Sequence, residues 1–484
     1  MTKKGVSDAD GFPKVSETEV PRRKKIKLET LFGDSPGASA LLIDLGVAYG
    51  CLAQGLAVST TTTTTTAPTE ILYAVFQMYD VAAVADDDVS LCGACAWLTT
   101  VMCIVGSPSL ANRFSQLAST YADLNPIDKC IAPASYAQMF YLGGEGRLKD
   151  AAHSAARAAA SYLAIGDMRR MRECTGIQIV LLRDIGRLQE GHDIGNRLLS
   201  DAYECGDLDV VEKVFASKSN VLVLLGKLDE GIAACNECRE LNRRSQKNDG
   251  KQKDIVDRPR STSVLAHCYL GNHELAEETY YTCLAEGVTT FFFWSGFYYS
   301  TIGAGLWEIL NHSAVKGKPI TSRLASAKEV TKKMLTKTKS LGLKAASPVV
   351  SFNEALDRFT NFDADYAAIQ ELFAKTQLTE SNVMVALSKF YAVLAKVVYE
   401  VRADRGITNK RVGSGSLKTA WTKPQNVVQS EMEVIKLRGE NLGLIKDAIE
   451  YCKVNDIGLY SGLVEKVLAI DNGVGVLVQW GEAP

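Results

Sequence analysis

The sequence predicts an all-α protein whose main part is a right-handed α-solenoid of helical hairpins, with repeats of about 40 residues. Three features predict this fold: a regular row of glycines, a small residue at a fixed distance after each, and leucines that begin the segments between. The glycines are Gly106, Gly146, Gly186, Gly226 and Gly271, at intervals of 40, 40, 40 and 45 residues.

The residue types explain the pattern. Glycine ends a helix because it adopts left-handed backbone angles without a Cβ clash. The residue five positions later is always small, which lets two antiparallel helices approach closely. One such hairpin cannot bury its apolar face alone, so the hairpins are expected to stack. The small residues are Ala111, Ala151, Gly191, Gly231 and Ala276.

A second set of chain breaks lies midway between the glycines. These breaks predict a looser turn at the far end of each hairpin. The polar stretch 243–254 is predicted to be a loop that lengthens one repeat. The midway breaks are Asp86-Asp87-Asp88, Asn125-Pro126, Gly166-Asp167 and Gly206-Asp207.

The flanking segments differ in composition from the repeats. Residues 36–69 read as a helix interrupted by seven threonines, Thr60 to Thr66, which suit a flexible insertion. Helices are expected over 320–342, 351–375 and 381–404, the last capped by Thr379 or Ser381. The predicted order is a disordered basic tail (1–35), the helix with its insertion (36–69), repeats (70–312), further hairpins (313–404), a linker (405–426), and a C-terminal helix with a short hairpin of strands near 467–480 (427–484).

Overall composition argues against several classes of function. The chain of 484 residues has 46% apolar and 23% charged residues and a formal net charge of −2. We therefore expect no general attraction to nucleic acid, no membrane span and no secretory leader. Twelve scattered cysteines favour reduced thiols and a cytoplasmic protein. The basic run Arg22, Arg23, Lys24 and Lys25 is either a nuclear localisation signal or a solvated linker.

The hairpin phrase resembles a known repeat family. Leu-Gly-x-Leu-x-x-Gly/Ala is similar to the tetratricopeptide repeat, although these units are longer than its usual 34 residues. Long units of this kind resemble the C-terminal repeat region of class III nucleotide cyclases fused to an AAA-type ATPase. The phrases that carry this resemblance are AAASYLAIGDMRRMRECTGIQIVLL (158–182), AHCYLGNHELAEETYYTCLAEG (266–287) and FFFWSGFYYSTIGAGLWEIL (291–310).

No cofactor or metal site is predicted. Cys235 and Cys238 have the spacing of a zinc or redox pair, but they occupy positions where such repeats place core residues. Cysteine as a small buried apolar residue is the favoured interpretation, and a metal or redox site is the alternative. The same alternatives apply to Cys92 and Cys95, and the five histidines show no ligand spacing.

Two groups of residues are candidates for contact with a partner. Arg169, Arg170 and Arg172 crowd a helix start, where positive charge is unfavourable unless carboxylates offset it, either in a partner or within the chain. Phe293, Trp294 and Tyr298 belong to an aromatic cluster too dense for one helix face, so they suit either core packing or a binding hot spot.

The expected function is protein binding without catalysis. The first helix of each hairpin is predicted to line an inner binding face, in the segments 130–142, 168–183, 213–224 and 261–270. The resemblance implies that the partner is a cyclase or ATPase module of a signalling assembly. The alternative is that the chain is the regulatory part of such an enzyme, whose catalytic domains this sequence lacks.

Overall fold

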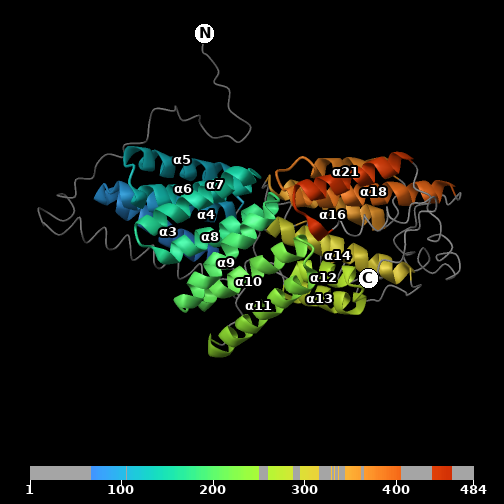
Figure 1. Ribbon diagram of the computed structural model, residues 1–484. Coiled ribbons are helices and arrows are strands. Elements are labelled where there is room, and N and C mark those ends of the chain that lie inside the picture. Colours follow the sequence, from blue (N-terminus) through green and yellow to red (C-terminus); the bar gives the residue numbers. More distant parts are fainter. Residues whose placement is uncertain are drawn as a thin grey trace, which may run out of the picture.

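The computed structural model describes residues 67–104, 106–249, 260–286, 295–315, 344–360, 365–404 and 439–459, and the single positions 329, 332 and 336 (Figure 1). These residues form sixteen α-helices and no strand, so the chain is a helical-repeat solenoid, as the sequence predicts. The Thr60–Thr66 run, the basic run near Arg22 and the predicted strands near 467–480 lie outside the described residues.

The helices fall into a repeat array followed by a C-terminal group. The array is α4 (Asp88–Ile104), α5 (Pro108–Leu124), α6 (Asp128–Gly144), α7 (Leu148–Ala164), α8 (Met168–Asp184), α9 (Leu188–Glu204), α10 (Leu208–Leu224), α11 (Leu228–Asp249), α12 (Arg260–Tyr269) and α13 (His273–Glu286). It is preceded by α3 (Ala67–Ala85) and followed by α14 (Ser295–Val315), α16 (Ala346–Thr360), α17 (Tyr366–Thr376), α18 (Asn382–Asp404) and α21 (Gly439–Val454).

One backbone turn joins nearly all helices of the array. The helices α4 to α10 each have 17 residues, and the glycine between two of them takes a φ of 73° to 80°. The amide after that glycine donates to the carbonyl five residues earlier, as Arg187 does to Leu182 (2.8 Å). This is the Schellman motif, which satisfies carbonyls at a helix end.

The expectation of a looser midway turn was wrong. Gly166 and Gly206 have φ values of 77° and 73°, like the other glycines, and their turns make the same bonds, Asp167 to Tyr162 and Asp207 to Ala202 (both 2.9 Å). Glycine allows the tight turn at both ends of the hairpin. Asp86 takes the left-handed conformation without being glycine (φ 55°), and the turn at Asn125, where a proline follows, is the exception.

Small side chains let the paired helices approach, as predicted. Ala111, Ala151 and Ala276 are fully buried. A Cβ on Gly231 would lie 2.5 Å from Cγ2 of Val223, so α10 and α11 meet too closely there for any larger residue. At Gly191 the nearest atom would lie 3.6 Å away, so alanine would fit.

Two predicted element limits were wrong. The stretch 243–249 continues α11 rather than forming a loop, because no helix breaker occurs before Gly250 and Arg243 pairs with Glu240 one turn back (2.7 Å). The segment 351–375 divides into α16 and α17, because the Asp365 carboxylate accepts the amide of Ala368 (3.0 Å) and starts a new helix. The predicted cap of α18 is confirmed, since the Ser381 hydroxyl accepts the amide of Met384 (3.3 Å).

The C-terminal helices lie against one edge of the array (Figure 1). We call residues 344–360, 365–404 and 439–459 the cover, and the turns at Gly146, Gly186 and Gly226 the covered edge. The Ala345 amide donates to the carbonyl of Gly144 (3.1 Å), and the Asn382 amide group donates to the carbonyl of Ile185 (2.7 Å). The covered edge is therefore joined to residues about 200 positions later in the chain.

The third turn of this edge has the tightest contact. A Cβ on Gly458 would lie 2.2 Å from the Leu225 carbonyl oxygen, and one on Gly226 would lie 3.2 Å from Gly458. Asn382 also donates to Asn455 (2.6 Å) and accepts from the Tyr451 hydroxyl (3.1 Å), which joins α18 to the end of α21. The start of α18 and the end of α21, both in the cover, therefore meet at the turn of Gly186.

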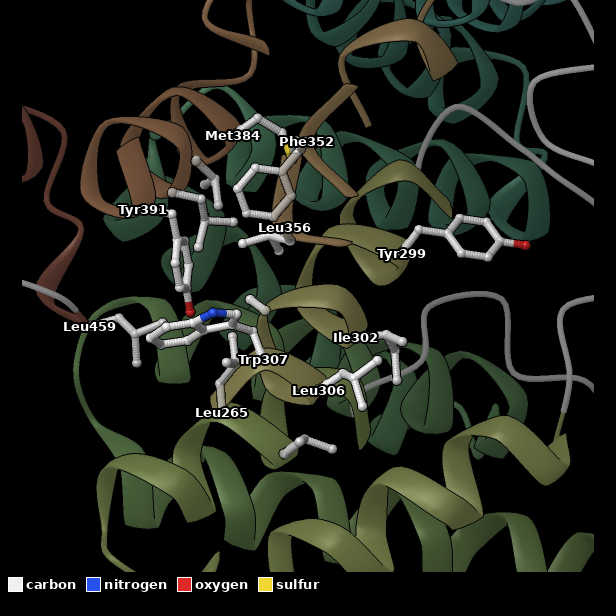
Figure 2. Close-up of a cluster of buried hydrophobic side chains, with 14 of the residues drawn as sticks. Leu265, Tyr299, Ile302, Leu306, Trp307, Phe352, Leu356, Met384, Tyr391 and Leu459 are labelled. Atoms are coloured by element: carbon white, nitrogen blue, oxygen red, sulfur yellow. The ribbon is translucent and has the colours of Figure 1, made fainter. Parts of the chain in front are cut away.

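An aromatic cluster fixes the cover to the end of the array. Figure 2 shows Trp307 of α14, Phe352 of α16 and Tyr391 of α18 in one buried cluster. The Trp307 ring stacks on Phe359 (5.4 Å between centroids) and meets Tyr391 edge-on (5.3 Å). Such large buried rings dominate core energetics, so this cluster contributes strongly to the attachment.

Candidate binding site

The opposite edge of the array carries the midway turns. We call residues 86–87, 125–127, 165–167 and 205–207 the open edge. Three of its turns use an aspartate as helix cap: Asp87 accepts the amide of Ser90 (3.1 Å), Asp167 that of Arg170 (3.1 Å), and Asp207 that of Val210 (3.2 Å). A carboxylate at a helix N-terminus offsets the unpaired amides and the positive end of the helix dipole.

Side-chain bonds connect neighbouring helices and turns near the open edge, both within a hairpin and between hairpins. The Asn125 amide donates to the Asp88 carboxylate (2.8 Å), and the Tyr136 hydroxyl donates to Glu173 (2.9 Å). Arg172 donates from Nε to Asp201 (2.6 Å), and its Nη1 lies 3.6 Å from an oxygen of Asp207. These bonds place the four turns side by side as one continuous surface.

The three predicted arginines have three different surroundings. Arg172 is nearly buried and pairs with Asp201 of α9 and with Asp207 in the turn that follows α9, and the bond to Asp201 raises its pKa. The Arg170 guanidinium lies over the buried Tyr162 ring, 5.6 Å from its centroid, with Asp167 3.7 Å away. Arg169 is exposed. Two of the three are therefore already in contact with groups of the chain itself.

The aromatic candidates do not form an exposed site among the described residues. Tyr298 is 4% exposed, and its hydroxyl donates to the carbonyl of Cys283 (3.0 Å). Its ring meets Tyr299 edge-on (5.5 Å), so it belongs to the core of α14. Phe293 and Trp294 lie outside the described residues.

The predicted inner face is open only over a short stretch. Residues 261–269 of α12 are all buried, and most of 130–142 and 213–224 is buried as well. The physical reason is that first helices of neighbouring hairpins pack on each other, and α14 packs on α12. Residues 168–178 of α8 are the accessible part, since only Cys174 among them is buried.

The cysteine pairs lie in the core. Cys92 and Cys95 are fully buried, as is Cys238, and Cys235 is almost so. The Cys92 thiol donates to the carbonyl of Cys130 (3.2 Å), and burial raises the pKa of Cys92 and raises that of Cys95 to about 12. Within the described part of the chain, no three His, Cys, Asp or Glu side chains gather as a metal site requires.

Sequence reasoning missed two exposed apolar side chains beside the open edge that occupy equivalent positions of the repeat. Leu163 and Tyr203 are 54% and 49% exposed, and both lie three residues before a midway glycine. The 40-residue spacing that located the glycines also relates these two positions, so a comparison of repeats at every position would have found them.

No family model matches the chain, and no curated protein matches it. None of the helices that the structure describes is both long and apolar enough to cross a bilayer.

Proposed function

We propose that this chain is a non-catalytic helical-repeat scaffold that binds a protein partner. The observation that carries the proposal is the contrast between the edges: among the described residues, the C-terminal helices cover one row of turns, while apolar side chains beside the other row are exposed. Exposed apolar positions that recur on a repeat array are typical of binding surfaces.

The resemblance to tetratricopeptide-like repeats supports the same class of function. In that family, stacked hairpins present a long surface to a peptide or a domain. The further resemblance to the repeat region of cyclase and ATPase proteins suggests a cyclase or ATPase module as the partner. The rival proposal, a regulatory part of such an enzyme, predicts cyclase metal-binding aspartates or a Walker motif encoded in frame upstream of Met1.

The proposal is tested by cross-linking the full chain in cells and mapping the linked residues by mass spectrometry. We expect one partner in stoichiometric amount, with cross-links from Lys129 and Lys213, which are exposed in helices that begin at the open edge. Lys332 is exposed outside the array and provides the comparison. Cross-links confined to Lys332 would contradict a function of the array.

Catalysis is tested separately. We expect the purified chain neither to cyclise nor to hydrolyse ATP or GTP with magnesium or manganese. Turnover that increases with protein concentration and survives repeated purification would contradict the proposal.

A further inference from the structure

The open edge exposes apolar side chains far more than the covered edge does. Single exposed apolar residues are ordinary on a protein surface, but a row of them at repeat spacing is not. Among described side chains, the windows 141–151, 181–191 and 221–231 around the covered turns contain no large apolar side chain as exposed as these. The exposed apolar residues in the open edge or within two residues of it are Leu124, Ile127, Leu163, Ile165, Tyr203 and Leu208, at 38% to 66%.

The repeat relates Leu163, Ile165, Tyr203 and Leu208 to equivalent positions one repeat away, whereas Leu124 and Ile127 align with Ala164 and Asp167. Leu163 and Tyr203 are equivalent, as are Ile165 and the exposed Cys205, and Met168 and Leu208. Because the bonds of Asn125, Tyr136 and Arg172 hold adjacent turns together, the equivalent positions form a stripe across the array.

The two edges also differ in charge, and the open edge is the more acidic of the two. Residues 81–91, 120–130, 161–172 and 201–211 carry ten carboxylates and four cations. The three windows of the covered edge carry six carboxylates and five cations. Asp123, Asp128 and Glu204 are exposed, so the apolar stripe lies beside solvent-facing negative charge.

We propose that the open edge binds a segment of another protein in which lysine or arginine alternates with aliphatic side chains. This inference rests on the proposed scaffold function and names the chemistry of its partner. Aliphatic side chains would cover the stripe while the cations meet the carboxylates beside it. A second copy of this edge is disfavoured, because two acidic edges would repel each other, and phosphate-rich nucleic acid is disfavoured for the same reason.

The test uses the full chain and a short fluorescein-labelled peptide that alternates lysine with leucine. Two control peptides replace lysine by glutamate, or leucine by serine. We expect saturable binding of the first peptide only, with an affinity that falls as salt rises because the charges are exposed. Equal binding of all three peptides would overturn the proposal.

Two sets of variants locate the site. Leu163→Ser with Tyr203→Ser should weaken peptide binding about tenfold by removing the apolar stripe. The matched control, Leu275→Ser with Leu444→Ser, changes side chains that are 46% and 39% exposed elsewhere and should leave affinity unchanged. Asp123→Asn with Glu204→Gln should weaken binding at low salt and flatten its salt dependence. If the edge pair and the control pair bind alike, the site lies elsewhere.

The chain's own basic run is the competing occupant. Replacement of Arg22, Arg23, Lys24 and Lys25 by Gln should leave the affinity for the added peptide unchanged. A marked gain in affinity would mean that the edge is filled from within the chain and would overturn the assignment to a separate protein. If the peptide fails to bind but cellular cross-links still map to the array, this inference falls and the scaffold function stands.

Discussion

The covered edge and the open edge are built from the same backbone turn, but among the described residues the turns of the covered edge contact the C-terminal helices and those of the open edge do not. At Gly186 and Gly226, on the covered edge, the chain returns about 200 residues later and bonds to the turn carbonyls or packs on them. At Gly166 and Gly206, on the open edge, a Cβ would meet nothing within 4 Å. The difference teaches that a repeat unit fixes the shape of a turn, whereas distant residues decide whether the turn becomes core or surface.

The largest expected effect concerns the contact that ties the cover to the array. The Tyr391 hydroxyl of α18 donates to the buried Glu308 carboxyl of α14 (3.0 Å), and burial raises the pKa of Glu308 to about 8. The folded state therefore keeps a proton that the unfolded state releases above its pKa of about 4.5. Stability from this group is complete below that pH and is lost as pH rises to about 8.

The loss should total on the order of 4 kcal/mol, and Glu308→Gln should remove it. Urea melts of both proteins between pH 5 and pH 9 measure this, since their difference isolates Glu308 from other titrating groups. Parallel pH profiles for the wild type and the variant would show that Glu308 does not titrate with unfolding.

The next prediction tests the tight turn of the covered edge. Gly458→Ala places a Cβ against the Leu225 carbonyl, and because backbone atoms cannot move aside it should cost about 3 kcal/mol. Gly206→Ala on the open edge meets no atoms and should cost only about 1 kcal/mol, from its left-handed φ. Thermal melts followed by circular dichroism measure both. Equal costs would mean that the cover does not rest on this turn.

Asn382→Ala should cost about 2 kcal/mol, because it leaves the Ile185 carbonyl and the Asn455 side chain without their donor. The open-edge counterpart, Asn125→Ala, removes one bond to Asp88 at a surface that water reaches, so it should cost less than 1 kcal/mol. Hydrogen exchange at the amides after Ile185 and after Asn125 distinguishes the two. Faster exchange only at the open edge would reverse the comparison.

The smallest expected effect lies in the ion pairs. Arg172→Ala should cost about 1 kcal/mol, because its nearly buried guanidinium pairs with two carboxylates, Asp201 of α9 and Asp207 of the turn after it. Lys344→Ala, which removes an exposed pair with Glu145 on the covered edge, should leave the free energy of unfolding nearly unchanged, because water screens the pair. Urea melts at low and high salt measure both, and a larger effect at Lys344 would contradict this ranking.

Local features of the fold could be predicted from the sequence because their causes are local. The glycine spacing, the small residue five positions on and the leucines that begin α7, α9 and α11 all follow from residues near each turn. The tightness of the midway turns could not be predicted from spacing alone, because the midway breaks differ in residue type and only Gly166 and Gly206 among them are glycines.

The candidate site was harder to predict for a physical reason. Whether a turn is covered depends on residues such as Asn382 and Gly458, which no local pattern connects to Ile185 or Leu225. The arginines at the start of α8 were recognised as needing carboxylates, and Asp201 and Asp207 supply them to Arg172. That the pairing occurs within the chain follows only from the packing of α8 against α9 and against the turn that follows α9.

The cover also bears on how the array responds to force. When stacked hairpins contact only their neighbours, the pitch of the array can change under load, because each interface between hairpins can shift by a small amount. Here three consecutive turns of the covered edge, at Gly146, Gly186 and Gly226, are bonded or packed to the cover, so the distances between them are fixed. Under load, extension should therefore be concentrated in the helices before Gly146, and the part of the array held by the cover should transmit the force without changing its pitch.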